Sequence, residues 1–144
     1  MSSKQQRTQA AIDIAMSQIP AGQVPKVVVR ATAGPAAGQA AATNFGLLGG
    51  LLGGRVVKDV YIVLTADWMA VVQASWFSGK PNALLAFGAR DANALSDVKI
   101  GRGRTFSGAV LRIPGAEKPT RLKVHPGWKK ELEAFAADLS SARA

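Results

Sequence analysis

An apolar stripe near the C-terminus constrains the fold more than any other feature of the chain. Trp128, Leu132, Phe135 and Leu139 recur at intervals of four, three and four residues, which is the spacing of one face of an α-helix. Burying such a face contributes about 1.5–3 kcal/mol for each large side chain. The helix must therefore dock on another element, and we expect it to cover the open end of a sheet formed by the preceding residues.

Seven segments between this helix and residue 26 are typical of β-strands. They are rich in β-branched or alternating apolar residues, and turn residues separate them. The expected strands span 26–32, 56–65, 68–75, 83–89, 95–100, 106–114 and 120–125. A weaker helical pattern over 3–17 predicts a short N-terminal helix that packs lightly on the body. We therefore expect residues 1–22 to form a helix and residues 23–144 to form one mainly β domain, with a loop over 35–55.

Length and composition exclude several classes of protein. A chain of 144 residues fits one domain, and a hydrophobic fraction of 48% is too high for a disordered protein. The chain has no cysteine, which excludes disulfides, zinc–thiolate sites, iron–sulfur clusters and thiol catalysis. We find neither a secretory signal pattern nor an apolar run long enough to span a membrane. We expect the protein in the cytoplasm, at the periphery of a membrane, or within a virion or other assembly.

Basic residues concentrate in the C-terminal half of the chain. The formal net charge is +9, and residues 97–130 hold nine Lys or Arg against two acids. Alternation along the expected strands places Lys99, Arg112, Arg121 and Lys123 opposite the apolar positions, so neighbouring strands would bring them onto one face. Such a stripe is either a solvated surface or a binding site for an anionic partner. We expect Phe106, beside this stripe, to belong to the core.

The least ordinary segment is the apolar, glycine-rich run from Phe45 to Gly54. Its large side chains are those of Phe45, Leu47, Leu48, Leu51 and Leu52. An exposed patch of this kind usually marks a contact site. Three roles stay open: contact with a protein partner or a second copy, shallow insertion into an anionic membrane, or folding back to cap the sheet.

We find no pattern that predicts catalysis. The single histidine, His125, is expected to be a structural residue at a strand end, and no nucleophile motif accompanies it. The segment from Ser78 to Pro81 and the segment from Gly101 to Arg104 both lack the spacing of phosphate-binding loops. We therefore expect no catalytic residue, no metal site and no cofactor.

The order of helix, seven strands and helix resembles that of small bacterial pleckstrin-homology-like (PH-like) domains. Residues 59–72, with a tyrosine, an apolar run, Leu64-Thr65 and an apolar hairpin, are similar to the pattern of those domains, as are 95–100 and the helix at 128–139. The resemblance implies a seven-stranded bent antiparallel sheet or barrel capped by a C-terminal helix. It also implies a scaffold that binds lipids, peptides or copies of itself without catalysis. Unlike headgroup-binding members, this chain has an apolar rather than a basic first loop.

The sequence thus predicts a non-catalytic interaction module, with protein contact or self-assembly through the 45–52 loop or a sheet edge as the main hypothesis. A bacterial or phage assembly would suit such a chain. One alternative is an anionic-lipid binder that uses the loop together with Lys26, Arg30, Arg55 and Lys58. The other is a nucleic-acid binder that uses the cations from Lys99 to Lys123.

Overall fold

The computed structural model describes residues 3–35, 58–75, 78–114 and 119–141. Two helices, a short 3-10 helix (η2) and seven strands make up these residues. Their order is α1 (Ser3–Met16), β1 (Val27–Pro35), β2 (Lys58–Leu64), β3 (Trp68–Ala74), β4 (Pro81–Ala89), β5 (Leu95–Lys99), β6 (Ser107–Leu111), β7 (Thr120–Val124), η2 (Pro126–Trp128) and α3 (Lys129–Ser141).

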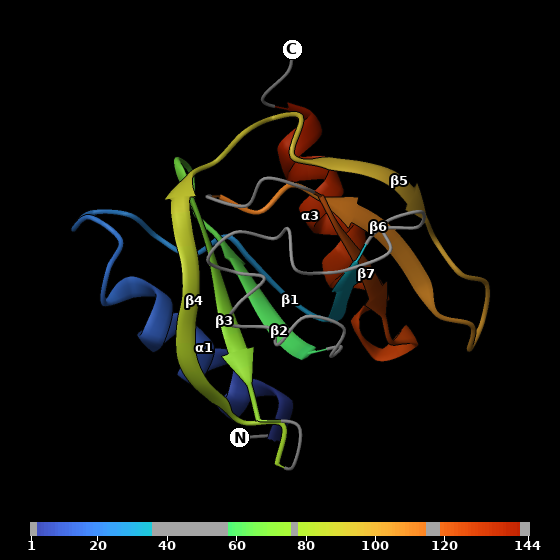
Figure 1. Cartoon of the computed structure of the whole chain (residues 1–144), viewed down its shortest axis with the longest axis horizontal. Helices are drawn as coiled ribbons and strands as arrows, with labels where there is room; N and C mark the ends of the chain where they lie inside the picture. The colour runs from blue at the N-terminus through green and yellow to red at the C-terminus, as the bar shows by residue number, and fades with distance from the viewer. Residues whose placement is uncertain (1–2, 36–57, 76–77, 115–118, 142–144) are drawn as a thin grey trace.

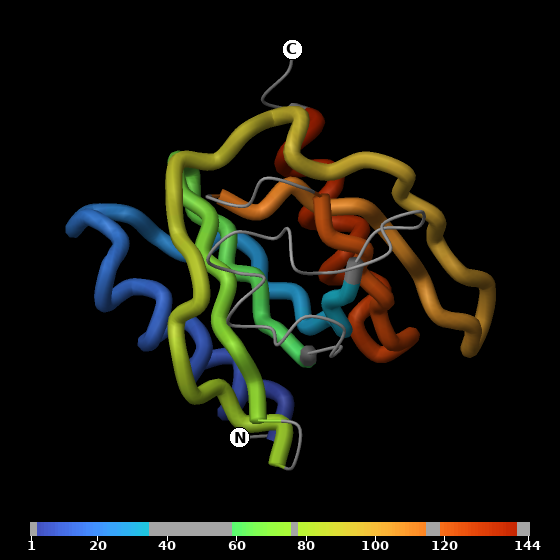
Figure 2. The backbone as a smooth tube through the Cα atoms, viewed as in Figure 1, coloured from blue at the N-terminus to red at the C-terminus, as the bar shows by residue number. Residues whose placement is uncertain are grey.

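The seven strands form one antiparallel sheet in the order β4-β3-β2-β1-β7-β6-β5. Strand β1 pairs with β2 over Val27–Ala33 and with β7 over Thr32–Pro35. It therefore bends and joins two halves of the sheet, β2–β4 and β5–β7, that lie on either side of it (Figures 1 and 2). The predicted mainly β architecture, a seven-stranded antiparallel sheet with a C-terminal helix and an additional N-terminal helix, is confirmed.

The inner faces of the two halves share one apolar core. Ile62, Leu64 and Val71 come from one half, while Leu111 and Leu122 come from the other, and all five are buried. Helix α3 contacts β1 and β5 and adds the predicted stripe to this core. Its members Leu132, Phe135 and Leu139 are fully buried, and Trp128, which ends η2, is nearly so. The prediction that this stripe docks on the sheet is confirmed.

Helix α1 covers the outer face of the β2–β4 half. It contacts β4, β2 and β3, and its small residues Ala11 and Ala15 are fully buried there. Because α1 covers one face and the core covers the other, the run from Val60 to Leu64 is buried at every position. This explains why β2 reads as a continuous apolar stretch rather than as an alternating one.

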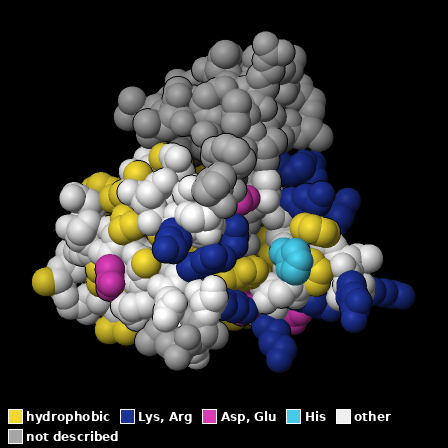
Figure 3. Space-filling model, turned by 90° about the horizontal axis from the view of Figure 1, so that it is seen from below, with side chains coloured by type: hydrophobic (Ala, Val, Ile, Leu, Met, Phe, Trp, Pro, Cys, Tyr) yellow, Lys and Arg dark blue, Asp and Glu magenta, His cyan; other side chains and the backbone are white. Residues whose placement is uncertain are grey.

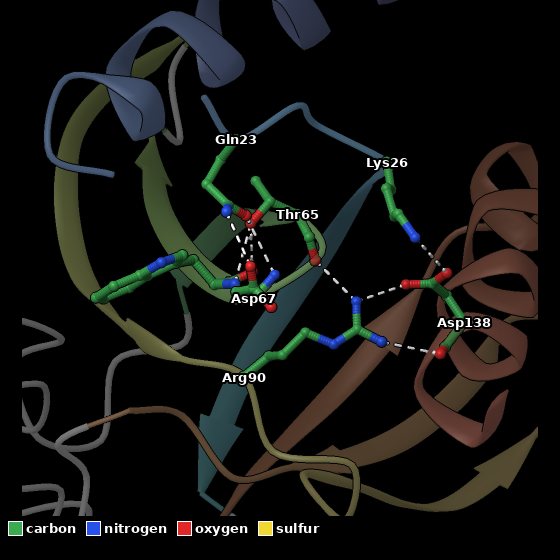
Figure 4. A network of polar contacts seen from close by, with 7 residues as sticks. Gln23, Lys26, Thr65, Asp67, Arg90 and Asp138 are labelled. Carbon is green, nitrogen blue, oxygen red and sulfur yellow. Dashed lines mark hydrogen bonds and ion pairs between the residues drawn. The ribbon is translucent and has the colours of Figure 1, made fainter. Parts of the chain in front are cut away.

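A polar network fastens the C-terminal end of α3 to the sheet (Figure 4). Arg90, directly after β4, donates from Nη1 to the Thr65 carbonyl and to Asp138 Oδ2, both at 2.7 Å, and from Nη2 to the Asp138 carbonyl at 2.9 Å. Lys26 Nζ lies 3.7 Å from the same Asp138 carboxylate. Hydrogen bonds to charged groups contribute about 1.5–3 kcal/mol each. Arg90 thereby links β4, the β2–β3 turn and α3 through one side chain.

Gln23 completes the network at the β2–β3 turn. Its Oε1 accepts hydrogen bonds from Thr65 Oγ1 at 2.9 Å and from the Asp67 amide at 3.2 Å, and its Nε2 donates to Asp67 Oδ2 at 2.9 Å. The segment between α1 and β1 is therefore held against the turn by a single amide side chain (Figure 4).

Tyr61 anchors the outer face of β2. Its hydroxyl donates to the Gly79 carbonyl at 3.0 Å, and its ring meets the Trp128 ring edge-on at a centroid distance of 6.0 Å. Burial raises the pKa of the Tyr61 hydroxyl above its ordinary value of 10.0, an effect that the nearby Arg30 and Arg7 only partly offset. The folded chain therefore holds this proton more tightly than the unfolded chain does.

Replacing Phe135 with alanine should destabilise the fold by about 3–5 kcal/mol, because the substitution opens a cavity where α3 meets the sheet. Urea denaturation followed by circular dichroism measures this loss. Glu133→Ala, an exposed change on the same helix, should stay within about 0.5 kcal/mol of the native chain. Equal effects of the two changes would contradict the docking of α3 described above.

Tyr61→Phe should remove about 1 kcal/mol at neutral pH by deleting one buried hydrogen bond. The raised pKa stabilises the native chain below pH 10.0, and this contribution is lost as the pH rises from there through the folded-state pKa. The stability gap between native chain and variant should therefore be constant up to about pH 9 and narrow above about pH 10. Denaturation midpoints measured across this range test the sign, and a gap that widens would contradict it.

Candidate functional site

Of the four cations in the predicted stripe, Lys99 ends β5, Arg112 directly follows β6, and Arg121 and Lys123 lie on β7. Lys99 pairs across the sheet with Gly108, Gly108 pairs with Lys123, and Lys123 pairs in turn with Thr32 of β1. Arg121 pairs with Val110, so alternation directs Arg121 and Lys123 to the same face. The three strands are neighbours, as the predicted cationic stripe requires. We call Lys99, Phe106, Gly108, Arg112, Arg121 and Lys123 the basic face.

Gly108 leaves a hollow at the centre of the basic face. The hollow measures about 350 Å³, and its lining includes Lys99, Phe106, Arg121 and Lys123. A Cβ atom added at Gly108 would meet the Leu122 carbonyl oxygen at 3.5 Å, which is ordinary contact. Crowding therefore does not require a glycine at this position. The absence of a side chain leaves open space between the cations of β5 and those of β7.

Phe106 is exposed on the basic face, which corrects the expectation that it belongs to the core. Its side chain is 50% exposed. The Lys123 ammonium lies 4.6 Å from the ring centroid, and the His125 ring meets it edge-on at 5.4 Å. The reason is alternation, because Ser107 points inward and its hydroxyl accepts a hydrogen bond from the Gly101 amide at 2.9 Å. The residue before it must then face outward.

The β5 strand also departs from the simple alternation that the sequence predicts. Val98 and Ile100 alternate with Lys99 in the sequence, so simple alternation would direct them inward, yet they are 37% and 38% exposed. A register shift lies between Ser96 and Lys99, and Asp97 adopts a φ of 49°. This irregularity turns the strand, so Val98, Lys99 and Ile100 are all exposed at the entrance to the β5–β6 hairpin.

A second hollow, of about 330 Å³, continues the surface toward β1 and β2. Arg30 and Asp59 line it and form an ion pair at 3.3 Å, and the Arg30 guanidinium also lies 5.7 Å from the Tyr61 ring centroid. His125 borders the same hollow, and its Nδ1 accepts a hydrogen bond from the Gly127 amide at 2.9 Å as the N-cap of η2. Figure 3 shows the cyan histidine among yellow apolar atoms and dark-blue cations.

The second predicted cation group does not form one cluster among the described residues. Lys26 lies by α3 and pairs with Asp138, whereas Arg30 pairs with Asp59 on the outer face. Arg55 lies outside the described residues, as do Phe45, Leu47, Leu48, Leu51 and Leu52. Lys58 begins β2, and its side chain is likewise outside the described set. The predicted lipid site over these residues therefore stays a prediction.

The cations of the basic face differ from the other cations in their partners. Within residues 3–35, 58–75, 78–114 and 119–141, ion pairs involve Lys4, Lys26, Arg30 and Arg90. Lys99, Arg112, Arg121 and Lys123 are exposed and form none with any residue in those ranges. Their positive charge is therefore not neutralised within the described part of the chain.

Other kinds of site have little support in the same residues. No group of three or more His, Cys, Asp or Glu side chains converges there to hold a metal ion. No described helix is long and apolar enough to cross a bilayer.

The sequence did not predict two features of the site, the exposure of Phe106 and the hollow over Gly108.

Comparison with known proteins identifies no family for this chain. No family model matches the chain, and no curated protein matches it. Among solved structures, the hSac2 domain from human phosphoinositide phosphatase Sac2 is similar, with 12% sequence identity and a TM-score of 0.46, over 99% of this chain and 84% of that chain. A likeness at this level carries no inference about what this chain binds, and membership of the bacterial PH-like family stays a prediction.

Proposed function

We propose that the chain is a non-catalytic interaction module that binds single-stranded nucleic acid through the basic face. One observation carries the proposal: cations without ion-pair partners in the described chain surround a hollow beside an exposed aromatic ring. This function places the protein in the cytoplasm or within a nucleic-acid-containing assembly.

Charge is the first argument for a polyanionic partner. Lys99, Arg121 and Lys123 approach one hollow from β5 and β7, so their fields add at one place. Bringing three like charges together costs free energy unless an anion lies among them. Phosphate groups would release condensed counterions on binding, which makes such an interaction favourable and strongly dependent on salt.

The aromatic ring is the argument for nucleic acid rather than for an acidic protein. Proteins that bind single strands combine a positive groove with aromatic side chains on which bases stack, each stack contributing about 1–3 kcal/mol. Phe106 is half exposed at the edge of the hollow, beside Lys123. A base could replace the Lys123 ammonium over the ring while that ammonium moves to a phosphate.

The extent of the basic face favours a strand over a membrane surface. Arg112 lies four residues beyond Gly108 along the chain, which corresponds to about 13 Å of extended strand. An anionic bilayer could contact the β5–β6 hairpin through Ile100, Arg102 and Arg104, which are exposed. An elongated polyanion would instead contact cations along the whole stripe. Anionic-lipid binding is thus the alternative that the experiments below decide.

Arg121→Ala combined with Lys123→Ala should weaken binding of a fluorescent oligothymidine about tenfold or more at low salt. Each lost phosphate contact should also reduce the slope of log K against log salt by about 0.7, so the pair should reduce it by about 1.4. Fluorescence anisotropy titrations at several salt concentrations measure both quantities. Lys80→Ala with Lys130→Ala, which removes the same charge from other exposed positions, is the matched control.

Two results would contradict this assignment. The first is that the control pair weakens binding as much as the test pair, which would show only a general response to net charge. The second is that the native chain sediments with anionic vesicles at moderate salt and leaves the oligothymidine free. That second result would favour the lipid-binding alternative.

Gly108→Leu should fill the hollow and reduce oligothymidine binding about tenfold while leaving the fold intact. The added Cβ meets only ordinary contact, and the strand tolerates a side chain that points outward. Val110→Leu, two residues along the same face, is the matched control and should bind normally. If Gly108→Leu folds and binds as tightly as the native chain, the hollow has no part in recognition.

A further inference from the structure

The two edge strands of the sheet differ in how they are protected. Only β4 and β5 have a single neighbouring strand among the described residues. The β5 edge carries Asp97 and Lys99, a register shift, and a positive φ at Asp97. Charges and bulges on an edge strand oppose pairing with another chain. The β5 edge is therefore poorly suited to receive a further strand.

The β4 edge has no charge along its length. Its nine residues, Pro81–Ala89, contain neither Lys, Arg, Asp nor Glu, and Phe87 is 42% exposed. Register shifts occur in its pairing with β3, but the run from Ala86 to Ala89 pairs regularly. In the described part of the chain, β3 is the only strand that pairs with it. Figure 1 shows β4 and β5 at opposite edges of the molecule.

The direction of the free backbone groups follows from the register. The Arg90 amide donates to the Asp67 carbonyl at 2.9 Å, which makes Asp67 and Arg90 a hydrogen-bonded pair. Such pairs alternate with non-bonded pairs in an antiparallel ladder, so Ala89 and Phe87 direct their N–H and C=O groups away from β3. These groups form the start of a ladder that an added strand would complete.

A groove lies beside β4. It has a volume of about 460 Å³ and lies between residues 82–87 of β4 and the α1 residues Ile14, Ser17 and Gln18. Apolar side chains such as Leu84, Leu85 and Phe87 line its β4 side, and the two polar α1 residues line its rim. The groove thus offers apolar contacts to the side chains of an incoming strand, next to the free backbone groups of Phe87 and Ala89.

We propose that β4 pairs antiparallel with β4 of a second copy of the chain, about a twofold axis. An uncharged strand meets its own copy without like-charge repulsion. Antiparallel pairing of a strand with itself closes after two copies, because each copy uses the same surface. The basic face uses β5, β6 and β7, and β1, β2 and β3 lie between these strands and β4 in the sheet, so the contact uses none of the strands of the basic face.

The dimer would carry two basic faces at its two ends. Both would remain free, since the contact uses only β4 and the groove beside α1. A single-stranded nucleic acid long enough to contact both basic faces would bind the dimer more tightly than it binds one face, because the second contact forms within the same complex. The dimer itself does not depend on the nucleic-acid proposal and can be tested without any ligand.

Sedimentation velocity of the full chain across micromolar to sub-millimolar protein tests the proposal. We expect the native chain to change from monomer to dimer as concentration rises. Ala83→Lys with Phe87→Lys, both exposed on β4, should remain monomeric at every concentration. Ser96→Lys with Val98→Lys adds the same charge to exposed positions of β5 and should dimerise like the native chain. Circular dichroism verifies that each variant is folded.

Three outcomes would overturn the proposal. They are a native chain that stays monomeric at every concentration, a β4 variant that dimerises, and equal loss of the dimer in both variants. Serine at Leu47, Leu48, Leu51 and Leu52 distinguishes the loop from the edge, since it should leave a β4 dimer intact. Should the β4 variant fail to fold, hydrogen exchange decides instead: the Phe87 and Ala89 amides of the native chain must become protected only at dimerising concentrations.

Discussion

The bend of β1 is the constraint on which the rest of the structure depends. One continuous strand pairs with β2 through its first part and with β7 through its last part, and the two pairings overlap at Thr32 and Ala33. The small inward residues Ala31 and Ala33 are buried at this place, where larger side chains would crowd the approach of the two halves. Because one strand belongs to both halves, their inner faces must turn toward a common interior, and α3 then supplies the side chains that complete it.

The same bend decides where the candidate site lies. Pairing β7 with β1 brings Lys123 beside Thr32, so the cationic stripe continues into the hollow that holds the Arg30–Asp59 ion pair. It also leaves β4 and β5 as the two edges, on opposite sides of the bent sheet. The proposed nucleic-acid surface and the proposed self-pairing edge are therefore separated along the sheet by β1, β2 and β3. One chain could use both surfaces at once.

Much of the fold was predictable because it is encoded locally. The helical spacing of the apolar residues from Trp128 to Leu139 predicted that one face of a helix is buried, and all four residues are buried. The β7 residues Arg121 and Lys123 alternate with Leu122 and Val124 as a strand requires. In contrast, Phe106 lies one residue before β6. The face of the sheet to which its side chain points depends on whether Ser107 points inward. The sequence offers no local signal for that choice.

Other features depend on residues that are distant in the chain. The Arg90 network joins Gln23, Thr65 and Asp138, whose spacing follows no helical or strand period. The hollow at Gly108 exists only because β5 and β7 flank β6, which is a matter of strand order. A glycine in an otherwise apolar strand does suggest a close approach or an opening, and it was the one available sign of this site.

An NMR titration would test the central claim, that the basic face binds single-stranded nucleic acid, most directly. Backbone amide shifts of the ¹⁵N-labelled chain are recorded while an oligothymidine of about 12 nucleotides is added. The account predicts shifts at Phe106, Gly108, Arg121 and Lys123, with little change along α3, and reversal of these shifts at high salt. Shifts that spread over α1 or α3 instead, or no shifts at all, would contradict it.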